Sequence, residues 1–142
     1  MKQETLKQSV VKAAKGLWIA FPMILGTILL ISLISVLVPK YFYFSVFSKN
    51  SFLDSFIGSL VGSISAGNPI TSYIFGGEML KQGVGLTAVT AFLVSWVTVG
   101  IIQLPAESAI LGKKFTILRN ISAFILSIIV AILTVLILEV LV

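Results

Sequence analysis

The chain has 142 residues, of which 58% are hydrophobic and 11% charged, with a net charge of +5 and a mean hydropathy of +1.13. A soluble domain of this size cannot hide so much apolar surface from water, so the composition predicts an integral membrane protein in the cell membrane, all-α in fold. The lack of cysteine and histidine excludes disulfides and almost every zinc site. No nucleophile–base pair is visible either, so we expect neither an enzyme nor a metal or cofactor.

Residues 1–16 are polar and basic, and their apolar side chains recur at helical spacing. This segment is interpreted either as an amphipathic helix at the membrane surface or as a flexible tail. Residues 17–38 follow as the first predicted transmembrane helix, because the run is too long for the apolar part of a signal peptide. An aromatic and basic connection over residues 40–51 is typical of the membrane interface.

Residues 52–80 interrupt the apolar pattern with the stretch GSISAGNPITSY. Gly67 permits a sharp turn, Asn68 fits a helix N-cap, and Pro69 fits the first residue of a new helix. We therefore expect one half-helix over about residues 54–66 and another over about 69–82. In the membrane, this segment is either a fourth full span or a re-entrant hairpin that enters and leaves on the same side.

The polar residues at this break are candidates for a solute-binding site. If a half-helix begins inside the membrane, its free N–H groups and the carbonyl groups of the preceding half-helix point to the same place. The candidates are Ser65, Gly67, Asn68, Pro69, Thr71 and Ser72. Gly58 and Gly62 form a GxxxG pair instead, which indicates close packing between helices.

Residues 86–104 form the next predicted span, which ends at Pro105. A stripe of small and hydroxyl residues on one face of this helix includes Ser95 and Thr98, which are added to the candidate translocation residues. Ordinary helix packing is the alternative for this stripe. Both alternatives stay open from the sequence.

Segment 105–120 begins with Pro-Ala-Glu, which is typical of a helix start, and residues 121–142 form the last predicted span. Glu107 lies at the membrane edge. It is predicted either to bind a coupling proton or cation, which makes it the last candidate site residue, or to pair with Lys113 or Lys114.

The distribution of basic residues distinguishes the two arrangements of segment 52–80. With the amino terminus in the cytoplasm, a full span leaves five Lys or Arg on each side. A hairpin instead leaves Lys2, Lys7, Lys12, Lys15, Lys113, Lys114 and Arg119 inside, against Lys40, Lys49 and Lys81 outside. The count favours the hairpin, while the balanced alternative corresponds to insertion in both orientations as an antiparallel dimer.

The order of the motifs GNP, KQG, AFL and LPAE over roughly residues 52–120 resembles the family of predicted permeases that includes the organoarsenical efflux permease ArsP. In that family, each of two halves carries such a break, so the resemblance implies transport. The chain has about half the expected length, which implies a homodimer or pairing with a second half-length permease. The family's arsenical exporters carry a cysteine at the break, whereas this chain has none, so the resemblance does not supply the cargo.

Together these features predict a single membrane domain over residues 1–142, with three to four transmembrane helices and a broken or re-entrant segment, as half of an inverted-repeat permease. The predicted function is the movement of a small solute across the cell membrane by a multi-pass subunit, through a site at the break. A passive ion channel and a structural or assembly subunit of a larger membrane complex are the alternatives. Lipid and a small solute are the expected partners, without nucleic acid.

Overall fold

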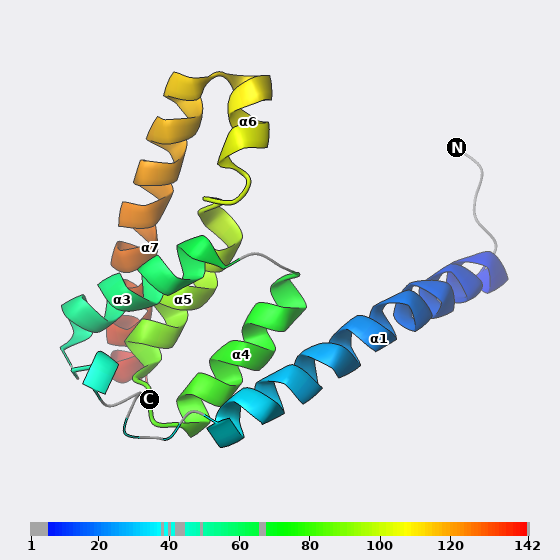
Figure 1. Ribbon diagram of the computed structural model, residues 1–142, viewed down its shortest axis with the longest axis horizontal. Helices are drawn as coiled ribbons and strands as arrows, with labels where there is room; N and C mark the ends of the chain where they lie inside the picture. The colour runs from blue at the N-terminus through cyan, green and yellow to red at the C-terminus, as the bar shows by residue number, and fades with distance from the viewer. Residues whose placement is uncertain are drawn as a thin grey trace. The chain divides into compact units, whose positions relative to one another are not determined.

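The computed structural model describes residues 6–37, 39, 41, 45–48, 50–65 and 68–141, and the regular elements of this part are all helices (Figure 1). The predicted turn residue Gly67 lies outside the described residues. The chain forms two compact units, residues 1–37 and residues 38–142. The helices are α1 Leu6–Leu37, α3 Ser51–Ile64, α4 Pro69–Lys81, α5 Leu86–Thr98, α6 Leu104–Leu111 and α7 Lys113–Leu141.

Helix α1 makes up the first unit and is one continuous helix of 32 residues, with Pro22 inside it. Its stretch Lys7–Leu33 is long and apolar enough to cross a membrane. From Leu6 onward, the polar start of the chain is therefore helical and continuous with the predicted first span.

Helix α7 is the second helix long and apolar enough to span a bilayer, with 29 residues. It begins at Lys113, earlier than the predicted start at residue 121. The reason is the backbone of Gly112, whose φ of +85° ends α6 and lets α7 begin at the next residue. Segment 105–120 is therefore helical on both sides of a single glycine and contains no extended loop.

Helices α3 and α5 pack with their backbones unusually close, because two glycines of α3 face the backbone of α5. A Cβ atom at Gly58 would overlap the carbonyl oxygen of Ala88, and a Cβ atom at Gly62 would overlap that of Phe92. The predicted role of the GxxxG pair in helix packing is confirmed. Since both contacts advance in the same direction along the two helices, α3 and α5 run parallel.

Helix α4 carries the chain back, antiparallel to α5. Its first residue, Pro69, lines the same pocket as Trp96 near the end of α5, while Gly76, further along α4, faces Val89 near the start of α5. Two half-helices were expected on either side of the break, and α3 and α4 confirm them. Because α3 runs parallel to α5 and α4 antiparallel to it, α3 and α4 run in opposite directions, and each packs on α5 rather than on the other.

The expected single span over residues 86–104 is wrong, because the helix is interrupted. Helix α5 ends at Thr98, Val99 is extended with φ −104° and ψ 114°, and α6 begins only at Leu104. Figure 1 shows α6 continuing beyond the end of α5, while α7 runs back along both. The second unit therefore contains two breaks. The first break is defined here as the connection between α3 and α4, whose described residues are Ser65 and Asn68, and the second break as residues 99–103.

The interior of the second unit combines small polar side chains with an apolar core cluster, which includes Met79, Val89 and Phe92, and its exterior is apolar. Buried side chains include Ser55, Ser59, Ser63, Ser72, Ser95 and Ser127, whereas many leucine, isoleucine and valine side chains of α3, α5 and α7 are exposed. In the described part of the chain, every buried side-chain nitrogen or oxygen has a hydrogen-bond partner. This distribution suits a protein whose outer surface faces lipid, since small residues and hydrogen bonds hold helices together there.

Candidate functional site

The first break is held by local capping chemistry. Asn68 has extended backbone angles, φ −72° and ψ 141°, and its side-chain oxygen accepts a hydrogen bond from the Ile70 N–H at 2.9 Å. Pro69 follows as the first residue of α4, where a missing N–H costs nothing. On the other side, Ser65 ends α3 in an extended conformation, and its hydroxyl donates to the Val61 carbonyl at 2.7 Å.

The second break is held from a distance by Asn120 of α7. The Asn120 side-chain oxygen accepts from the Gly100 N–H at 2.9 Å, and its amide nitrogen donates to the Thr116 carbonyl at 3.0 Å. That same nitrogen donates to Glu107 of α6 at 3.3 Å. A buried side chain thus supplies a partner for a backbone group that the interrupted helix leaves without one.

An ion pair stands beside the second break. Nη1 of Arg119 lies 2.6 Å from each carboxylate oxygen of Glu107, and Nη2 lies 3.5 Å from the carbonyl oxygen of Thr98 at the end of α5. The Glu107 side chain is 19% exposed and that of Arg119 39%. The partner of Glu107 is therefore Arg119, and not Lys113 or Lys114 as one interpretation of the sequence expected.

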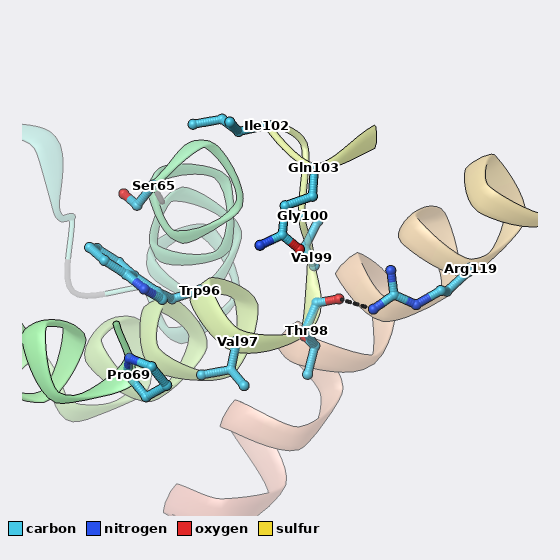
Figure 2. A pocket seen from close by; sticks show the side chains of 10 residues that line it. All are labelled: Ser65, Pro69, Trp96, Val97, Thr98, Val99, Gly100, Ile102, Gln103 and Arg119. Atoms are coloured by element: carbon cyan, nitrogen blue, oxygen red, sulfur yellow. Dashed lines mark hydrogen bonds between the residues drawn. The ribbon is translucent and has the colours of Figure 1, made fainter. Parts of the chain in front are cut away.

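The two breaks meet at one pocket of about 220 Å³ (Figure 2). They also touch directly, because the Ile101 N–H donates to the Ser63 carbonyl at 3.4 Å. Figure 2 shows Trp96 and Pro69 on one side of the pocket and the guanidinium of Arg119 on the other, with Gln103 between them. The lining residues are Ser65, Pro69, Trp96, Val97, Thr98, Val99, Gly100, Ile102, Gln103 and Arg119.

The structure places some of the predicted site residues at this pocket and others in the packing of helices. Ser65, Pro69 and Thr98 line the pocket, Asn68 caps the helix that starts at its wall, and Glu107 pairs with the lining residue Arg119. Gly67 is outside the described residues, and Thr71 is half-buried in α4 without lining the pocket.

Two other predicted residues are buried inside the second unit and do not line the pocket. The Ser95 hydroxyl is fully buried and donates to the Ser59 carbonyl of α3 at 2.6 Å. Ser72 is also fully buried, and its hydroxyl donates to the Pro69 carbonyl at 2.7 Å. Ser95 thus joins α3 to α5, as the packing interpretation of its stripe expected, and Ser72 stabilises the first turn of α4.

Eight residues of the site were missed as site residues from the sequence: Trp96, Val97, Val99, Gly100, Ile102, Gln103, Arg119 and Asn120. Arg119 entered the sequence analysis only as one of the basic residues that indicate the orientation of the chain in the membrane. Gly100 lies in an apolar run with no local turn signal. A glycine five residues before Pro105, with the Arg119-Asn120 pair further along, was the available hint. In the described part of the chain, no group of His, Cys, Asp and Glu side chains is suited to hold a metal ion.

The helices, their packing and the pocket together define the class of the protein. Two helices long enough to span a bilayer, an apolar exterior and small hydroxyl side chains buried between helices are typical of a helical membrane protein. Interrupted helices that meet at a polar pocket are the arrangement in which membrane transporters hold their solutes.

The chain belongs to a family of predicted permeases, ArsP_1, whose sequence profile matches residues 8–140. The resemblance seen in the motifs over residues 52–120 is thereby confirmed and extends over nearly the whole chain. Membership implies a membrane transporter rather than an enzyme. No curated protein and no solved structure shows a significant match to the chain.

Proposed function

We propose that this protein is a half-size permease subunit and that the pocket between the two breaks holds a small solute during its passage across the cell membrane. The observation that carries the proposal is that both breaks line one pocket. Ser65 of the first break and Pro69, the first residue of α4, lie on it, and Val99, Gly100, Ile102 and Gln103 of the second break complete it. Non-helical backbone is tolerated inside a bilayer only where protein or a polar cavity covers it. A pocket at the meeting point of two such segments supplies that cavity.

We further propose that α3 and α4 form a re-entrant hairpin. They have 14 and 13 residues, which corresponds to about 20 Å each and falls short of the roughly 30 Å of a bilayer core. Helix α5 is equally short, so the second break also falls inside the membrane and α6 completes the crossing. The excess of basic residues on the cytoplasmic side under this arrangement supports it.

The permease subunit is proposed to act with a second copy of the chain or with a second half-length permease. An inverted pair would place two sets of breaks around one pathway near the middle of the membrane. Cross-linking and mass measurement in mild detergent test this pairing. A component of a larger complex would instead purify with several unlike subunits.

The hairpin predicts the accessibility of single cysteines, which is readily measured because the natural chain has none. Ser51→Cys, before the hairpin, and Gly85→Cys, after it, are expected to react with a membrane-impermeant maleimide from the same side. Both positions are exposed in the structure. Lys113→Cys, on the far side of the next crossing, is the matched control and is expected to react from the opposite side. Labelling of positions 51 and 85 from opposite sides contradicts the hairpin, and labelling of every position from both sides indicates dual insertion.

The pocket assignment predicts that Asn68→Ala and Pro69→Ala reduce transport without preventing insertion. Loss of the Asn68 cap costs about 1 kcal/mol and loosens the start of α4, while removal of Pro69 changes the pocket wall. We expect transport to fall about tenfold or more, measured as the flux of a panel of labelled small solutes into proteoliposomes. Asn50→Ala removes an equivalent cap at the start of α3, away from the pocket, and is expected to transport normally. Normal flux in both pocket variants would show the assignment to be wrong.

A further inference from the structure

We propose that the pocket recognises a small solute through an anionic group, such as a carboxylate or phosphonate, which binds Arg119 in place of the Glu107 carboxylate. This inference rests on the proposed function and names the substrate class of the same site. Among the ten residues that line the pocket, Arg119 is the only one with an ionisable side chain. An anion that enters the pocket therefore meets a cation there, whereas a cation meets no lining carboxylate.

The guanidinium of Arg119 has N–H groups that can donate hydrogen bonds to a bound anion. It carries five N–H groups in a planar fork, and within the described part of the chain its hydrogen bonds go to the Glu107 carboxylate and the Thr98 carbonyl. The Thr98 contact is long, at 3.5 Å. With 39% of its side chain exposed, Arg119 is reachable from the pocket, and its fork matches the geometry of a carboxylate or phosphonate.

When a solute anion replaces Glu107 at Arg119, Glu107 still has a hydrogen-bond partner. Its carboxylate also accepts a hydrogen bond from the Asn120 amide nitrogen at 3.3 Å, and this bond does not depend on Arg119. A solute anion can thus take over the guanidinium while the Glu107 carboxylate, 19% exposed, keeps a hydrogen-bond donor. In this role Glu107 is an internal competitor that holds Arg119 in place until the solute arrives.

The pocket's other walls limit the size and shape of the solute. A volume of about 220 Å³ corresponds to about seven water molecules in the liquid. Trp96, Pro69 and Val97 provide an apolar wall opposite the guanidinium, and Gln103 offers a neutral amide between them (Figure 2). A short organic acid, with its anionic end toward Arg119 and its carbon chain toward Trp96, fits this distribution.

Trp96 allows a direct binding experiment. The chain has two tryptophans, so Trp18→Phe leaves Trp96 as the only indole reporter, and it lines the pocket. We expect acetate and methylphosphonate to change its emission saturably in phosphatidylcholine nanodiscs, while acetamide, which has the shape of acetate without its charge, and methylammonium do not. Arg119→Gln is expected to weaken acetate binding at least tenfold, and Arg119→Lys to retain part of it.

Two further variants separate recognition from folding. Glu107→Gln removes the internal competitor and is expected to tighten acetate binding several-fold, an effect that a purely structural ion pair would not produce. Lys114→Gln removes an exposed cation of α7 outside the pocket and is expected to change nothing. If Arg119→Gln does not fold, the double variant Arg119→Gln with Glu107→Gln leaves no unpaired charge beside the second break and is expected to fold without binding acetate.

The inference is overturned if acetamide binds as well as acetate, or if the folded variants without Arg119 bind acetate normally. Loss of the acetate response in nanodiscs that contain phosphatidylglycerol assigns the site to an anionic lipid headgroup and also overturns it. Binding of neutral probes alone removes the anion preference but leaves the pocket as a solute site. If no probe affects Trp96 and the variants at residues 68 and 69 transport normally, the proposed function fails as well.

Discussion

Substitution of Gly58 or Gly62 is expected to destabilise the second unit strongly. A Cβ at either position would overlap a backbone carbonyl of α5, which cannot move aside as a flexible side chain can. Overpacking of this kind typically costs about 1–3 kcal/mol and occasionally more, so we expect about 3 kcal/mol for alanine and no folded protein for leucine. The measurement is unfolding in mixed detergent micelles, followed by circular dichroism.

Gly77 provides the matched control for this prediction. It lies in α4, and a Cβ there would meet nothing within 4 Å. Gly77→Ala is expected to be neutral or to stabilise the protein by up to about 1 kcal/mol, because alanine has the higher helix propensity. If Gly58→Ala unfolds at the same detergent concentration as Gly77→Ala, the close approach of α3 and α5 is not present in the membrane protein.

Asn120→Leu is expected to have the largest effect on the second break. The substitution keeps the approximate size of the side chain but removes its hydrogen bonds to Gly100, Thr116 and Glu107. An unsatisfied buried group costs about 1–3 kcal/mol, so we expect a loss of roughly 2–4 kcal/mol and a fall in transport of at least tenfold. Exchange of backbone hydrogen for deuterium over residues 99–103 should accelerate, because the Gly100 N–H loses its partner.

The same exchange measurement on Asn50→Ala supplies the control. Asn50 caps α3 through bonds to Phe52 and Leu53, so its loss destabilises a helix end without touching the second break. We expect exchange to accelerate near residues 51–54 only. Unchanged exchange over residues 99–103 in Asn120→Leu would contradict the assignment of Asn120 as the residue that holds this break.

Much of the first break could be predicted from the sequence because its chemistry is local. The Asn68 side chain reaches an amide two residues along the chain, and the missing N–H of Pro69 suits the start of a helix. Both effects follow from neighbouring residue types alone. The packing role of Gly58 and Gly62 was predictable for a similar reason, since their spacing places them on one helix face.

The second break could not be predicted in the same way. Residues 86–104 form a nearly continuous apolar run, which has the length expected of a membrane helix. The partner of the Gly100 amide is Asn120, twenty residues away, and no local pattern connects the two. The pairing of Glu107 with Arg119 rather than with Lys113 or Lys114 likewise depends on how α6 folds back on α7.

By itself, then, the sequence determined that the protein is a helical membrane protein, that a helix restarts at Asn68-Pro69, and that Gly58 and Gly62 mark a close contact. Hydropathy, capping and residue spacing depend on a few neighbouring residues, so the features that they determine can be predicted from the sequence. Only the tertiary structure decided that the span after residue 86 is interrupted, that the two breaks share one pocket, and that Arg119 lines it. Those features arise from hydrogen bonds and contacts between helices, which depend on how α3, α5 and α7 pack.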